Sequence, residues 1–159
     1  MSLARSKRIG ESVEGAVFQA VPELTPVSGR DAHVDARVST TIDPSERVPT
    51  VALPVVERGT ELEIKSCGVV VTDDQSRGRF YLRETQHEYL LEVGGSYLFA
   101  VTPPHGSEPL ALKIVPATIV SDVISGWIDP DGRETYAQVS WGRVFDPEEV
   151  EDRPGGDRP

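Results

Sequence analysis

Cysteine is almost absent from this chain of 159 residues, and long apolar runs are missing altogether. Because Cys67 is the only cysteine, no disulfide can form within the chain, which favours the reducing cytoplasm. No apolar run approaches the roughly twenty residues that span a membrane, so we expect no membrane insertion. The basic residues 1–9 are followed by Gly10 and Glu11 rather than by an apolar stretch, so we expect no secretory signal. There is also no glycine-rich loop of the kind that cradles phosphates.

Lysine is the next scarce residue, while acidic residues are abundant. The chain has three lysines among 16 basic residues, 26 acidic residues and a net charge of −10. This composition resembles proteins of salt-loving archaea and their viruses. A protein that binds DNA by neutralising phosphates is normally basic, but in molar salt the release of counterions contributes little to binding. The alternative interpretation is a solvated acidic surface that binds no partner.

Periodicity divides the chain into a basic lead-in over 1–9, one domain over 10–148 and a disordered acidic tail over 149–159. Apolar residues at helical spacing predict helices, and alternating or β-branched runs predict strands. The predicted helices cover 10–21, 84–92 and 116–127. The predicted strands cover 33–42, 50–56, 61–71, 79–83, 96–102, 110–115 and 136–144. Residues 22–31 are predicted as a loop, and the order of elements indicates an α/β or α+β domain with a mixed sheet.

The strand over 61–71 carries the most informative pattern in the chain. Side chains two residues apart point to the same face of a strand, so Glu61, Glu63 and Lys65 share one face. Burying a carboxylate and an ammonium group together is costly, which suggests the mouth of a cleft. There the carboxylate can hold Mg²⁺, and the ammonium group can orient water or stabilise phosphate charge. The alternative is an ion pair on an exposed strand.

The residues around this pair resemble a known family. Glu61–Cys67 is similar to the second half of the PD-(D/E)XK nuclease motif, and Gly78–Leu82, Gln86–Leu91 and Ser96–Val101 resemble the strand, helix and strand that follow it. The resemblance covers roughly residues 8–101 and implies a restriction-endonuclease-like mixed central sheet flanked by helices. It also implies cleavage of DNA phosphodiesters with Mg²⁺ or Mn²⁺, by a resolvase-, repair- or restriction-type enzyme. Small nucleases of this kind often act as homodimers.

The family also requires an acid upstream of Glu63. Asp35 is our choice, because it lies on a predicted strand between apolar residues, and we expect Asp35 and Glu63 to hold the metal ion together. Its separation from Glu63 is longer than the family usually shows. Asp43 lies closer in sequence but precedes Pro44 in a predicted turn, and Asp31 is a third candidate.

Three further residues are candidates for the site. Many relatives carry a glutamate on the first helix, as archaeal Holliday-junction resolvases do. Glu14 is the better match and Glu11 the alternative. Gln86 and His87 begin the helix after the Glu63 strand, and either could contact the scissile phosphate. For His87, a polar position on the helix surface is the alternative.

Three hypotheses follow from the sequence. The first is a small Mg²⁺-dependent DNA endonuclease with Asp35, Glu63, Lys65 and Glu14 in its site. The second is a protein of nuclease fold that binds nucleic acid or a partner without cutting. The third is an acidic viral or archaeal interaction protein in which Glu63 and Lys65 form only an ion pair. The third is favoured if no acid lies close to Glu63 in the folded chain.

Overall fold

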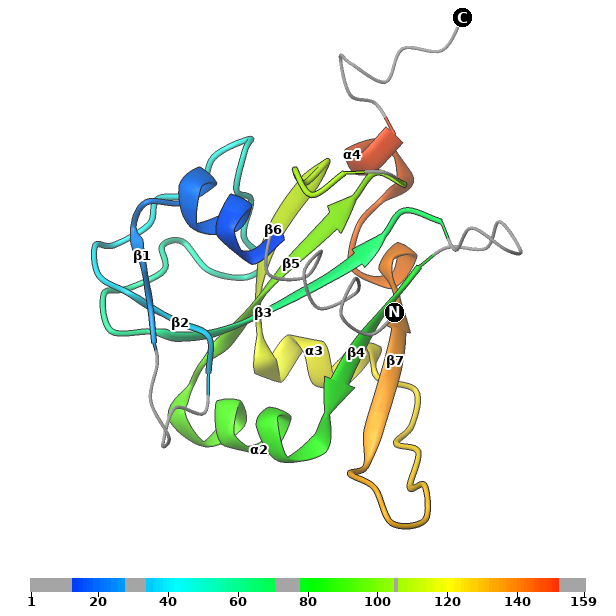
Figure 1. The fold of residues 1–159 in the computed structure, drawn as a ribbon. Coiled ribbons are helices and arrows are strands. Elements are labelled where there is room, and N and C mark those ends of the chain that lie inside the picture. Colours follow the sequence, from blue (N-terminus) through cyan, green and yellow to red (C-terminus); the bar gives the residue numbers. More distant parts are fainter. Residues whose placement is uncertain (1–12, 28–33, 71–77, 105, 152–159) are drawn as a thin grey trace, which may run out of the picture.

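A computed structural model describes residues 13–27, 34–70, 78–104 and 106–151 (Figure 1). Its centre is a five-stranded sheet in the order β1-β2-β3-β5-β6, in which β3 is the middle strand. β3 and β5 are parallel and the other neighbours are antiparallel, so the sheet is mixed, as the sequence predicted. The strands are β1 (Leu24–Pro26), β2 (Ala36–Val38), β3 (Glu61–Gly68), β5 (Ser96–Thr102) and β6 (Ala111–Pro116).

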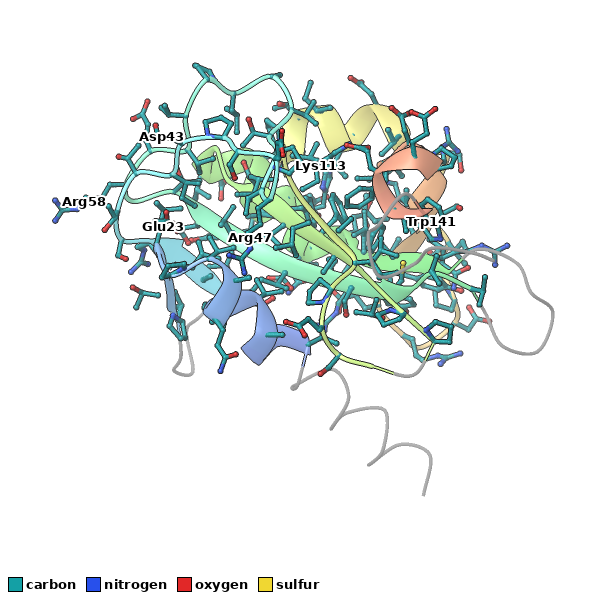
Figure 2. All side chains as sticks on the ribbon, turned by 90° about the horizontal axis from the view of Figure 1, so that it is seen from above. Glu23, Asp43, Arg47, Arg58, Lys113 and Trp141 are labelled. Atoms are coloured by element: carbon teal, nitrogen blue, oxygen red, sulfur yellow. The ribbon has the colours of Figure 1, made fainter. Side chains whose placement is uncertain are left out.

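The two faces of this sheet bury different clusters of apolar side chains. On one face, Leu62 and Leu98 pack with Val13 and Val17 of the helix formed by residues 13–20. On the other face, the rings of Tyr97 and Phe99 belong to a second cluster, which also takes side chains from the helices α2 (Glu84–Val93) and α3 (Ala117–Val123). Figure 2 shows the sheet between the blue helix and the yellow helix α3. The sheet is therefore flanked by helices on both sides.

A separate antiparallel pair of strands covers part of the second face. β4 (Arg79–Arg83) pairs with β7 (Tyr136–Ser140) and does not join the central sheet. The ring of Phe80 lies 4.5 Å from the ring of Phe99 of β5, so the buried side of this pair packs onto the sheet. The sequence predicted the bounds of β4, and the structure adds its partner.

Helix α2 ends where two glycines predicted its end. Gly94 has a φ of 69°, the left-handed conformation typical of a residue that closes a helix, and its N–H donates to Leu90 O. A Cβ at Gly95 would lie 2.7 Å from the carbonyl oxygen of Glu61, so only glycine lets the chain pass this close to β3. The turn therefore sets α2 against the start of β3. Within the described part of the chain, no helix is both long and apolar enough to cross a membrane.

Two of the predicted strands were wrong in part or in whole. Residues 50–56 form no strand, and only Thr50 and Val56 make isolated bridges, to Ile114 and Ile42. Pro54 within this segment cannot donate to a ladder. The strand predicted over 33–42 is regular only over the three residues of β2. Its neighbour β1 lies within 22–31, which was predicted as a loop, and was therefore missed.

The C-terminal elements also differ from the sequence prediction. β7 stops at Ser140, and a short 3₁₀ helix over Trp141–Arg143 follows, where a longer strand was predicted. α4 (Pro147–Glu151) includes residues that the sequence assigned to a tail. It forms because Val150 is buried. Residues 152–159 and the lead-in over 1–9 lie outside the described residues.

Candidate active site

Glu63 and Lys65 lie side by side on the central strand, facing the same side of the sheet as α2. The Nζ atom of Lys65 is 3.4 Å from Oε2 of Glu63, and both side chains are nearly buried, with 12% and 5% of their surface exposed. The strand position explains the pairing, because residues two apart share a face. The middle strand of the sheet therefore carries a buried ion pair at a place where apolar residues would pack without the free-energy cost of desolvating two charges.

Gln86 of α2 joins the two charged groups. Its Nε2 donates to Oε2 of Glu63 over 2.7 Å, and its Oε1 accepts from Nζ of Lys65 over 3.2 Å. One turn further along α2, the hydroxyl of Tyr89 donates to Oε1 of Glu61 over 2.6 Å. Gln86 and Tyr89, three residues apart on α2, thus bond Glu63 and Glu61, two residues apart on β3. These contacts fix the position of α2 along β3.

Asp35 lies close to Glu63 at the start of the neighbouring strand. It directly precedes β2, and its N–H donates to Leu62 O over 3.1 Å. Its carboxylate Oδ2 accepts from the N–H of Ile64 over 2.9 Å. These two bonds bracket Glu63. The negative charge of Asp35 is also close enough to raise the pKa of Glu63.

Burial dominates the electrostatics of Glu63. The residue as a whole is 4% exposed, and desolvation raises the pKa of its carboxyl group from 4.5 to about 7, although the charge of Lys65 opposes this rise. Its Oε2 is occupied by Lys65 and Gln86, whereas its Oε1 is buried and accepts no hydrogen bond from any described residue. A buried carboxylate oxygen without a partner is costly, and a cation beside it would remove that cost.

The donor set fits a hard divalent cation. Asp35 and Glu63 offer carboxylate oxygens, the ligands that Mg²⁺ and Mn²⁺ prefer. Within the described ranges, no three His, Cys, Asp or Glu side chains gather in a geometry that could hold a metal ion. Mg²⁺ keeps several waters and often takes only one or two carboxylates from a protein. Two acids therefore suffice for an ion of this kind.

The other candidate acids lie elsewhere or outside the described residues. Glu14 lies on the helix over 13–20, which packs against the face of the sheet opposite Gln86. Its part in the site stays a prediction. Asp43 is exposed and lies on the side of the molecule opposite to Trp141 (Figure 2). Glu11 and Asp31 fall outside the described residues.

His87 has different partners from Gln86, its neighbour on α2. It is 4% exposed, with Nδ1 2.9 Å from the hydroxyl of Tyr97 and Nε2 2.8 Å from Oγ of Ser121. Burial lowers the pKa of His87. Both ring nitrogens are thus engaged in holding α2 to β5 and α3, and the structure does not bring the ring beside Glu63.

Tyr97 is a neighbour of the site that the sequence did not indicate. The parallel register pairs Tyr97 of β5 with Glu63 of β3. Its pKa is raised, first by burial and then by the charge of Glu63. All seven residues of β5 are buried, so its sequence reads as a plain core strand. Only the pairing of β3 with β5 could have indicated Tyr97.

The structure thus has a mixed sheet with an acid and a lysine two residues apart on its central strand, and a second acid directly before the adjoining strand β2. The family model of the PD-(D/E)XK nuclease superfamily domain matches residues 1–146. The chain therefore belongs to the PD-(D/E)XK nuclease superfamily, as its resemblance predicted, and membership usually means nuclease activity. Comparisons with curated proteins and with solved structures give no match.

Proposed function

We propose that this protein is a divalent-metal-dependent endonuclease that hydrolyses DNA phosphodiester bonds. The observation that carries the proposal is the Glu63–Lys65 pair, with a buried carboxylate oxygen that has no described partner. Membership in the superfamily supports nuclease activity. To this activity we add a divalent metal ion as the cofactor and DNA as the substrate.

The carboxylates of Asp35 and Glu63 would hold Mg²⁺ or Mn²⁺. Such an ion supplies a Lewis acid and lowers the pKa of bound water. Glu63 has to be deprotonated to bind it, and a cation beside its unpartnered Oε1 would offset the desolvation that raises its pKa. Asp35, whose Oδ2 is fixed by the Ile64 N–H, presents its carboxylate from the next strand.

Lys65 would act on the water and the phosphate. Its Nζ is held by Glu63 and Gln86 at 3.4 and 3.2 Å, so the ammonium group has a fixed position at the edge of the carboxylate. From there it can orient the attacking water and stabilise the charge that develops on the phosphate. An arginine would carry the same charge, but its planar guanidinium group presents its donors in a different geometry and does not readily lose a proton.

Cleavage assays on Lys65 variants test the proposal. Supercoiled plasmid and four-way-junction DNA are incubated with Mg²⁺ or Mn²⁺ over a range of salt concentrations. The wild-type protein should cut, and Lys65→Ala and Lys65→Arg should each lower the rate by about 100-fold or more, as loss of a key transition-state contact does. Circular dichroism should show an intact fold for both variants.

The same assays define what would contradict the proposal. If wild-type and Lys65→Ala proteins cut equally, Lys65 has no catalytic role. If neither cuts any substrate, the chain is a nuclease-fold protein that binds nucleic acid or a partner without catalysis, or an acidic interaction protein. Cutting both strands of a duplex with one site per chain would be served by a homodimer, which sedimentation of the active protein would detect.

A further inference from the structure

The pair of strands β4 and β7 presents an outer face that has no part in the proposed chemistry. Phe80 and Leu82 of β4, and Ala137 and Val139 of β7, are buried against the core. Because side chains alternate along a strand, the intervening residues point away from the core. In antiparallel strands, directly paired residues share a face, so these outward residues form one surface. This ribbon face consists of Arg79, Tyr81, Arg83, Tyr136, Gln138 and Ser140.

Two tyrosines form the centre of the ribbon face. The rings of Tyr81 and Tyr136 stack with their centres 4.6 Å apart and their planes 8° apart. Tyr81 is nevertheless 48% exposed. An aromatic ring held flat by a neighbour, with half of its surface in water, contributes little to the core. It is suited to stacking against a planar group of a ligand.

The charge of the ribbon face is opposite to that of the whole chain. β4 and β7 contain no acidic residue, whereas the chain carries a net charge of −10. Arg79 and Arg83 are exposed on either side of Tyr81, and no described carboxylate forms an ion pair with them. Among the described residues, Glu84 follows Arg83 and Glu134 bonds Thr85, so acidic side chains lie at the end of β4 where α2 begins.

We propose that the ribbon face is a DNA-binding surface, with Arg79 and Arg83 on phosphates and Tyr81 stacked on an unpaired base. Guanidinium groups match phosphate oxygens, and aromatic side chains between basic residues are typical of surfaces that bind single-stranded nucleic acid. The strand β4 runs directly into α2, whose Gln86 contacts the Glu63–Lys65 pair. This inference rests on the proposed function, because the ribbon face would bind the DNA substrate next to the proposed active site.

Binding measurements on exposed residues test this surface. Fluorescein-labelled DNA is titrated with the full chain in EDTA, so that nothing is cut, and binding is followed by anisotropy. One probe is a fully paired duplex and the other is the same duplex with an unpaired tail. The variants are Tyr81→Ser and the double variant Arg79→Ser with Arg83→Ser. The matched control is Arg58→Ser, an exposed arginine in the turn before β3, far from Trp141 in Figure 2.

Each variant has its own expected signature. Loss of two phosphate contacts should reduce the slope of log K against log salt by about 1.4 to 1.8, since each contact contributes about 0.7 on a single strand and 0.9 on a duplex. Tyr81→Ser should weaken binding of the tailed probe by about tenfold, and binding of the duplex much less. The control should match the wild type in both. All substitutions are at exposed positions, so circular dichroism should be unchanged.

The outcome separates this inference from the proposed function. If Tyr81→Ser binds the tailed probe as the wild type does, or if the double arginine variant keeps the wild-type salt slope, the ribbon face does not bind DNA. A wild-type protein that still cuts DNA then keeps the proposed function. If instead the wild type binds but never cuts, and the variants lose binding as expected, the proposed function fails and the DNA-binding surface stands.

Discussion

Burial disfavours the ionised form of the Glu63 side chain, and this should make the stability of the protein depend on pH. The pKa of Glu63 is raised by burial from 4.5 to about 7. Below about pH 4.5 the carboxyl group is neutral in both the folded and the unfolded chain. As the pH rises, the unfolded chain loses its proton first, so the free energy of unfolding of the metal-free protein decreases up to about pH 7.

Comparison with Glu63→Gln isolates this effect. A shift from 4.5 to about 7 corresponds to about 3 kcal/mol. The Glu63→Gln protein should therefore gain up to about 3 kcal/mol relative to the wild type between pH 4.5 and pH 7.5. Urea unfolding in EDTA at each pH measures it. A difference in the free energy of unfolding that stays constant with pH would show that the pKa of Glu63 is not raised in the folded protein. Adding Mn²⁺ should reduce this difference at high pH.

Part of the site was readable from single residues, and part was not. The spacing of Glu63 and Lys65 placed them on one face, and the structure has them in contact. Asp35 was preferred because a strand was predicted around it; the structure places it directly before β2, bonded to the residues that flank Glu63, and its role as a metal ligand stays a prediction. The bridging contacts of Gln86 depend on how α2 packs on β3, which no local pattern specifies. The buried position of His87 arises from the same packing.

At the scale of elements, Lys113 fastens the C-terminal helix to the sheet. Its Nζ donates to Oε1 of Glu149 over 2.7 Å and to Val144 O over 2.9 Å, and it lies 4.9 Å from the centre of the Phe145 ring. Glu149→Gln would leave the nearly buried ammonium group without its counter-charge. Because Glu149 itself is a third exposed, we expect a loss of about 1–3 kcal/mol in the free energy of unfolding.

A double variant provides the control for the ion pair between Lys113 and Glu149. Lys113→Met together with Glu149→Gln replaces the ion pair by an apolar group of similar length, which is often close to neutral. Urea unfolding should show Glu149→Gln destabilised and the double variant largely restored. Equal unfolding midpoints for the wild type and Glu149→Gln would mean that the ion pair contributes nothing to the stability of α4.

Strong local signals explain which elements were predicted correctly. β4, α2 and β5 combine clear periodicity with the stop at Gly94 and Gly95, and their bounds agree with the prediction to within one residue. β1 contains Pro26 and has three residues, so its pairing with β2 decides its structure. The apolar residues over 50–56 suggested a strand, but this segment makes only isolated bridges to other residues and no regular strand pairing. Tertiary contacts, which local patterns do not record, determined these segments.

At the scale of the whole molecule, the excess of acidic residues governs the response to salt. A net charge of −10 makes the folded chain repel itself when salt is low, and added ions screen this repulsion. We expect the melting temperature to rise as KCl increases from about 0.1 M to about 2 M, by about 3 °C for each kcal/mol of repulsion relieved. Differential scanning calorimetry measures it, and a midpoint that falls with KCl would contradict the interpretation.

The most direct test of the metal-dependent nuclease compares two glutamates on one strand. Glu63 and Glu61 lie two residues apart on the same face of β3. Glu61 accepts a hydrogen bond from the hydroxyl of Tyr89, whereas Glu63 is the residue whose pKa the charge of Asp35 raises. The initial rate of plasmid cleavage with Mg²⁺ is measured for Glu63→Gln and Glu61→Gln. Glu63→Gln should abolish cleavage, because it removes the charge of the carboxylate proposed to hold the metal ion, while Glu61→Gln should cut at close to the wild-type rate. Equal rates for the two variants would contradict the assignment of Glu63 as the central metal ligand.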